Sequence, residues 1–145
     1  METINHEYYV SLEVAKLLKE AGFDYGCREY YKFTDEGYRF RWNALPVNWN
    51  KKVAALIAEK YGLSEGYSAL TLDVAQRWLR EVKGILLYIT PKRVNMEWKW
   101  FFWYIDLRDK TNIEQRYSTK NFNTYEKAQE AGIKKALEII LEKGD

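Results

Sequence analysis

The stretch EWKWFFWYID, residues 97–106, decides the fold of this 145-residue chain. Its length and its β-favouring residues predict one long strand. Successive side chains of a strand point to opposite faces, so this strand is aromatic on both sides. One face is expected to carry Trp98, Trp100, Phe102 and Tyr104, and the other Phe101, Trp103 and Ile105.

One aromatic face is expected to pack on helices. The other face is covered by the rest of the chain, is covered by a partner subunit, or stays open as a stacking surface for a base or a sugar. Burial within the chain is favoured because large aromatic side chains are costly to expose, although Trp and Tyr are also enriched at interfaces. Which face is open therefore decides where a binding site lies.

Strands on both sides of this segment complete a meander. Residues 85–90 are apolar and β-branched, which predicts a strand that Pro91 ends. A further strand is expected at about 113–118. Together with 97–106 they make three consecutive antiparallel strands.

Helices flank this meander in the sequence. Thr71 is placed to cap a helix that Gly84 terminates. A last helix is expected to begin at Asn123 or Thr124, with Glu126 reaching back in a capping box. The order α-βββ-α over 71–143 is similar to that of a double-stranded RNA-binding domain.

The first half of the chain predicts a helix, a hairpin and a second helix. Ser11 can cap the first helix and Gly22 can end it. Residues 28–42 form two short β-type runs around a turn, and residues 43–50 are expected to be a connection. A short helix is expected at 53–61.

The predicted fold class is α+β, with the order α-ββ-α-α-βββ-α and an antiparallel sheet packed on helices. The whole chain, 1–145, is expected to be a single domain. Within it, an α-β-hairpin subunit at 9–62 and an α-βββ-α subunit at 71–143 would share one core.

Composition narrows the classes of function. The formal net charge is only +2, so any binding to nucleic acid needs a local patch. Cys27 is the only cysteine, and the N-terminal residues lack the pattern of a signal peptide. No apolar run approaches the ~20 residues that span a bilayer, so we expect a cytoplasmic protein without a membrane segment.

Catalytic and metal-binding patterns are missing from the sequence. His6 is the only histidine, which leaves no conventional triad, and Cys27 beside Arg28 is more simply a small buried side chain. Single glycines at turns exclude phosphate-binding loops. We therefore expect no catalytic residue, no metal site and no cofactor.

The candidate binding residues are alternating arginines and aromatics of the hairpin, together with aromatics of the long strand. They are Tyr38, Arg39, Phe40, Arg41, Trp98, Trp100, Trp103 and Tyr104. Arg39 and Arg41, with Arg28 and Lys32, would form a local cationic face suited to single-stranded nucleic acid. The plainer interpretation is a solvated strand face.

Three blocks of the chain resemble a family of short hypothetical proteins from gut bacteria and their prophages. They are SLEVAKLLKEAGF, AQRWLREVKGI and YEKAQEAGIKKALEII. The resemblance implies a bacterial or phage-borne protein and carries no catalytic residue.

The chain departs from double-stranded RNA-binding domains at the start of the last helix. Those domains place a cluster of lysines there, whereas this chain has Lys120 and Lys127 but no cluster.

The sequence favours a non-catalytic binding or interaction protein that uses the aromatic strand surface, with a protein partner or a second copy of the chain as ligand. Two alternatives stay open. One is a nucleic-acid binder that uses the Arg/aromatic face. The other is a small hydrolase, which requires two acidic residues converging in a pocket.

Overall fold

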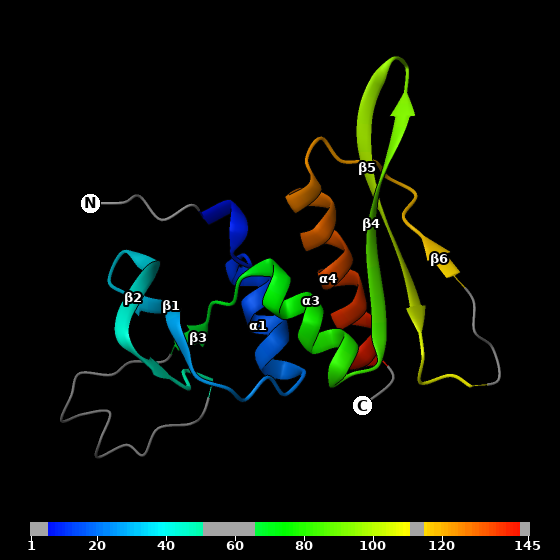
Figure 1. Ribbon diagram of the computed structural model, residues 1–145. Coiled ribbons are helices and arrows are strands. Elements are labelled where there is room, and N and C mark those ends of the chain that lie inside the picture. Colours follow the sequence, from blue (N-terminus) through cyan, green and yellow to red (C-terminus); the bar gives the residue numbers. More distant parts are fainter. Residues whose placement is uncertain (1–5, 51–65, 111–114, 143–145) are drawn as a thin grey trace. The chain divides into compact units, whose positions relative to one another are not determined.

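The computed structural model describes residues 6–50, 66–110 and 115–142 (Figure 1). Helices and two antiparallel sheets confirm the α+β class. The chain divides into two compact units. Val10–Leu70 form the N-terminal unit, whereas Thr71–Asp145 join Met1–Tyr9 in the C-terminal unit. The helix expected at 53–61 lies outside the described residues.

The N-terminal unit combines one described helix with a three-stranded sheet. Its elements are α1 (Leu12–Glu20), β1 (Cys27–Thr34), β2 (Gly37–Val47) and β3 (Gly66–Ser68). Both neighbours of β1 run antiparallel to it, in the order β2-β1-β3. The short strand β3 was not expected, since three residues give no readable alternation.

Helix α1 begins and ends where the sequence predicts. Ser11 Oγ accepts a hydrogen bond from Val14 N at 3.3 Å, as an N-cap side chain does. Gly22 takes the left-handed conformation with φ +97°, and Phe23 N donates to Leu18 O at 2.9 Å. The helix buries its apolar stripe, including Leu18.

Strand β2 is longer than predicted, because residues 43–47 continue the strand instead of forming a connection. A bulge between Cys27 and Glu29 of β1 brings Cys27 opposite Val47. Pro46 is tolerated because β2 lies at the edge of the described sheet, where a missing N–H breaks no ladder bond.

The C-terminal unit contains a second sheet and two longer helices. Its elements are η1 (His6–Tyr8), α3 (Leu72–Glu81), β4 (Ile85–Val94), β5 (Glu97–Asp106), β6 (Gln115–Tyr117) and α4 (Tyr125–Glu142). The strand order is β4-β5-β6, an antiparallel meander as predicted. Tyr9 pairs with Thr71 where the chain returns to this unit.

Both helices of this unit start at threonine caps. Thr71 Oγ1 accepts from Val74 N at 3.3 Å, and Thr124 Oγ1 accepts from Lys127 N at 3.1 Å. Of the two predicted starts of α4, the structure selects Thr124. Glu126 is then one position short of the site that a capping box requires.

Strand β4 runs past Pro91, where the sequence predicts its end. Pro91 lies opposite Trp100 in the ladder with β5. It fits because β4 is at the edge of the described sheet and needs no partner on its outer side. A two-residue turn follows, with Asn95 and Met96 both at positive φ, as a tight hairpin favours.

Helices α3 and α4 pack together and cover one face of this sheet. Gly132 of α4 allows the close approach, since a Cβ there would lie 2.6 Å from Leu87 Cδ1 and 3.1 Å from Phe102 Cβ. The core of the unit consists of buried apolar residues of both layers: Leu72, Ala75, Trp78, Leu79, Ile85, Leu87, Phe102, Ala128, Ile133, Ala136, Leu137 and Ile140.

Candidate binding surfaces

The two faces of β5 have different surroundings. Phe102 lies on the face that meets α4 and is almost fully buried. Trp100, on the same face, makes an edge-to-face contact with Tyr125 of α4 at 5.4 Å between ring centroids. Phe102 therefore belongs to the core of the unit and Trp100 packs beside it, whereas Trp98, on the same face, is 63% exposed.

The opposite face carries a continuous aromatic row across all three strands. The aromatic face is defined here as Tyr88, Phe101, Trp103 and Tyr117. Trp103 lies opposite both Tyr88 of β4 and Tyr117 of β6 in the ladders. Its ring stacks on Tyr88 with centroids 4.2 Å apart and planes at 18°, and it lies 6.1 Å from Tyr117 at 35°.

The ends of this row remain in contact with water. Tyr88 is 42% exposed and Tyr117 is 64% exposed, so neither ring is part of the core. The charges on this face lie toward the β4–β5 turn. Lys92 Nζ is 5.8 Å from the Phe101 ring centroid, and Lys99 pairs with Glu97 at 3.3 Å.

The four candidate residues of β5 are divided between the two faces. Trp103 lies on the aromatic face, whereas Trp98, Trp100 and Tyr104 belong to the face that carries Phe102. Tyr88 and Tyr117 are not among the binding residues predicted from the sequence. Their positions follow from the strand register, which places both opposite Trp103.

The candidate residues of the hairpin in the N-terminal unit are likewise divided between the two faces of their strands. Lys32 lies opposite Arg39 and Tyr30 lies opposite Arg41, so these four residues share one face. This set is the cationic face. Arg28 lies within the bulge, outside the regular pairing.

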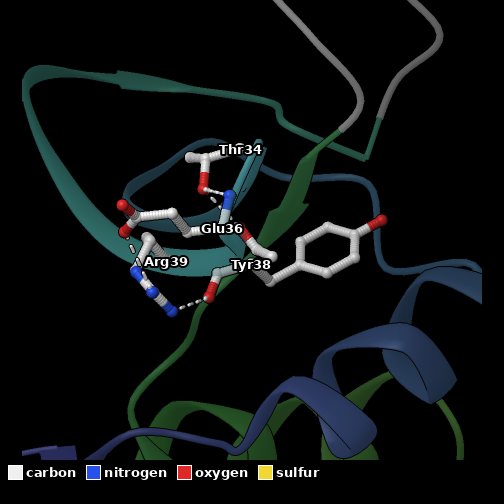
Figure 2. A network of polar contacts seen from close by, with 5 residues as sticks. Thr34, Glu36, Tyr38 and Arg39 are labelled. Atoms are coloured by element: carbon white, nitrogen blue, oxygen red, sulfur yellow. Dashed lines mark hydrogen bonds and ion pairs between the residues drawn. The ribbon is translucent and has the colours of Figure 1, made fainter.

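Tyr38 and Phe40 lie on the other face of the hairpin. Figure 2 shows the Tyr38 ring and the Arg39 guanidinium directed to opposite sides of the strand. Lys16 Nζ of α1 lies 5.1 Å from the Tyr38 ring centroid, and Tyr31 donates to Val10 O at 2.6 Å. These contacts link this face to α1 and to Val10, two residues before it.

Arg39 is held in place by neighbours in the hairpin turn. Nη2 contacts Glu36 Oε2 at 3.3 Å, and Nη1 donates to Tyr38 O at 3.4 Å (Figure 2). Glu36 N in turn donates to Thr34 Oγ1 at 3.2 Å. The turn therefore orients the guanidinium without burying it.

A pocket of about 470 Å³ lies between β5, the chain after β6 and α4 in the C-terminal unit. Aromatic side chains including Tyr104 and Phe122 line it, together with three lysines, Lys120, Lys134 and Lys135. Glu138 is the one carboxylate among the described residues that line it. The pocket can accommodate a small molecule with an apolar body and a negative charge.

A second pocket, of about 400 Å³, brings two carboxylates together. Asp73 and Glu126 line it with Tyr8 and Tyr125. Burial, and next the charges of Asp73 and Glu126, raise the pKa of Tyr125. The raised pKa favours the neutral phenol of Tyr125, which can donate a hydrogen bond.

Cys27 is poorly suited to nucleophilic chemistry. Burial raises the pKa of its thiol to about 11, the hydrogen bond with Ser68 lowers it in part, and the Glu29 charge adds the smallest upward contribution. The thiolate is the reactive form, and little of it exists near neutral pH. Within residues 6–50, 66–110 and 115–142, no group of three or more His, Cys, Asp or Glu side chains is placed to hold a metal ion.

Comparisons with known proteins give no family or relative from which the role of these surfaces could be inferred. None of the helices in the described parts of the chain is long and apolar enough to cross a membrane. The chain matches no family model, and it has no match among curated proteins or solved structures.

Proposed function

We propose that this chain is a non-catalytic binding protein that docks a protein partner on the aromatic face. The observation that carries the proposal is the row of Tyr88, Trp103 and Tyr117, which crosses three strands opposite the helix-covered side and stays exposed at both ends. Tyr and Trp are the side chains that most often anchor protein interfaces.

A protein surface suits this row better than a nucleic-acid base. Base stacking requires a free ring face, and the facing sides of Tyr88 and Trp103 already stack on each other at 4.2 Å. The contact between Trp103 and Tyr117 at 6.1 Å fills the other side in part. An apolar protein surface can pack against ring edges as well as ring faces.

The charges near the row define the partner further. Lys99 is neutralised by Glu97, whereas Lys92 lies above Phe101 and no ion pair of its own is present among the described residues. The best-matched partner presents an apolar patch with a carboxylate at the edge that meets Lys92. Such a polar rim around an apolar centre is the usual anatomy of an interface.

Site-specific photo-crosslinking tests the proposal. The photoreactive amino acid benzoylphenylalanine replaces Tyr88 or Tyr117 in one pair of variants. In a matched control it replaces the exposed Val82, which follows the last residue of α3. The variants are expressed in bacterial cells, the origin that the family resemblance implies. We expect crosslinks from positions 88 and 117 to one protein that position 82 does not capture.

The captured protein is then purified and titrated into the chain by calorimetry. We expect Tyr117→Ser to weaken the affinity at least tenfold and Val82→Ser to leave it unchanged, because interface energy concentrates in a few aromatic anchors. Equal crosslinking from all three positions, crosslinks only between copies of the chain, or equal affinity of both serine variants would overturn the proposal.

A further inference from the structure

The cationic face of the N-terminal unit places like charges directly opposite each other. Lys32 of β1 pairs in register with Arg39 of β2. Arg41 follows two positions later on the same strand and the same face. Like charges in directly opposite positions destabilise a sheet, so the fold alone does not explain this arrangement.

Acidic side chains of the described residues balance these charges only in part. Among the described residues of β1, β2 and β3, the only carboxylate is Glu29, which pairs with Trp42 on the opposite face. Glu36, in the turn, pairs with Arg39 at 3.3 Å, and its own side chain is 82% exposed, so the pair stays in contact with water. The face therefore keeps a surplus of positive charge that an external anion can neutralise.

An aromatic pair adjoins the charges. Tyr30, opposite Arg41, stacks on Trp49 with centroids 3.7 Å apart and planes at 13°. Trp49 Nε1 donates to Cys27 O at 2.9 Å, which fixes the indole over the strand. Trp49 is only half-buried, so part of the indole is accessible to another planar ring.

We infer that this face binds single-stranded nucleic acid. Lys32, Arg39 and Arg41 contact consecutive phosphates, and a base stacks on Trp49. Positive side chains that follow a backbone, next to an aromatic ring on which a base stacks, are the general means of binding single strands without sequence readout. The inference concerns the N-terminal unit and does not depend on the aromatic face of the other unit.

A duplex does not offer the same match. Bases within a double helix are stacked on their neighbours and present only edges, so Trp49 would have no partner in it. Inorganic polyanions share the phosphates but have no ring to stack. The contribution of Trp49 therefore distinguishes single strands from both.

Fluorescence anisotropy on the full chain tests the inference. The probes are a labelled 20-nucleotide single strand, a labelled duplex of the same length, and inorganic polyphosphate as competitor. Three phosphate contacts predict a slope of log K against log salt of about −2 for a single strand. We expect the triple variant Lys32→Gln, Arg39→Gln, Arg41→Gln to lose the slope and at least tenfold in affinity.

A matched control removes charges from another exposed ion-paired site. Arg77 pairs with Glu81 on α3, as Arg39 pairs with Glu36, and Arg80 also contacts Glu81. Arg77→Gln with Arg80→Gln should leave the affinity and the slope unchanged. If this variant weakens binding as much as the triple variant does, the interaction is a general charge effect and the inference is wrong.

Two substitutions at Trp49 identify the stacking contribution. Trp49→Phe keeps a ring and should retain most of the affinity, whereas Trp49→Leu should lose about fivefold to tenfold, with circular dichroism confirming that both variants are folded. Tighter binding to the duplex, complete displacement by equimolar polyphosphate, or equal affinities of the Phe and Leu variants would each contradict the inference.

Discussion

Gly132 of α4 lies so close to Phe102 of β5 that a methyl group at position 132 would come within 3.1 Å of the Phe102 Cβ and within 2.6 Å of Leu87 Cδ1. The helix thus rests directly on the strand that decides the fold, and the contact sets which face of β5 is internal. The aromatic face is the side of β5 that α4 does not cover, and Tyr88 and Tyr117 are exposed on it.

Gly132→Ala should therefore destabilise the C-terminal unit. Overpacking costs about 1–3 kcal/mol, and the better helix propensity of alanine returns about 1 kcal/mol, so we expect a net loss of roughly 1 kcal/mol. Chemical denaturation followed by circular dichroism measures the change. In the double variant with Leu87→Ala, the loss of unfolding free energy should be smaller than the sum of the two single losses. The shortened side chain at position 87 leaves room for the new methyl group.

A buried amide links both helices to the sheet. Gln129 Nε2 donates to Asp73 Oδ1 at 2.7 Å and to Gln76 Oε1 at 2.8 Å, and Gln76 donates to Leu87 O at 2.7 Å. Gln129→Glu replaces the donor with a carboxylate beside Asp73, which raises the pKa of the new side chain in the folded state.

The sign of the resulting pH dependence follows from that raised pKa. The variant should approach the wild-type free energy of unfolding below the unfolded pKa of Glu, about 4.3, and should lose stability as the pH rises through the folded pKa. Urea unfolding at pH 4 and pH 7 measures it. Gln129→Met, which cannot titrate, is the control, and an equal deficit at both pH values for the Glu variant would contradict the expectation.

The raised pKa of Cys27 predicts that its thiol reacts slowly in the native protein. It also predicts that the free energy of unfolding falls at high pH. The pKa of the thiol is raised from 9.0 to about 11 by burial, so the unfolded chain ionises first. The stabilising effect is complete below pH 9 and is lost as the pH rises toward 11. Thiol labelling at pH 8 should be far slower in the native protein than in urea.

The variant Cys27→Ala isolates this contribution from that of the tyrosines, which titrate in the same range. We expect the free energy of unfolding to fall more steeply between pH 9 and pH 11 in the wild type than in the variant. Parallel pH profiles of the two proteins would show that the thiol is not protected.

The sequence indicates the fold most accurately where local chemistry decides the structure. Ser11 and Thr71 mark helix starts because each hydroxyl meets an N–H three residues later in the same segment. The length of 97–106 was likewise readable, since seven of its ten residues are strongly β-favouring. Edge strands were less readable, because whether Pro46 or Pro91 ends a strand depends on the presence of a neighbour on its N–H side.

The candidate surfaces were predictable only in part, for a related reason. Alternation along β5 gives two aromatic faces but does not say which one α4 covers. That choice depends on the close approach at Gly132, a long-range contact. Tyr88 and Tyr117 join Trp103 through the register of three strands, which no single segment encodes.

The opposed charges of the hairpin lead to a prediction about stability. Lys32→Glu converts the repulsion with Arg39 into an attraction and should stabilise the protein by roughly 0.2–1 kcal/mol. Thermal unfolding at low and high salt measures the effect, which should shrink as salt screens it. Lys32→Gln should give about half of the gain, and destabilisation by the Glu variant at low salt would mean that Lys32 contributes to the fold itself.

The bond from Val10 N to Leu70 O at 2.9 Å brings the two ends of the N-terminal unit together, and Tyr9 bridges Thr71 one residue further out. This layout is that of an insertion, a stretch of chain that leaves its host and returns at the same point. Insertions with adjacent ends can be exchanged or deleted without rerouting the host chain. The N-terminal unit, with its cationic face, can therefore be exchanged or removed as one piece without a change in the chain path of the C-terminal unit.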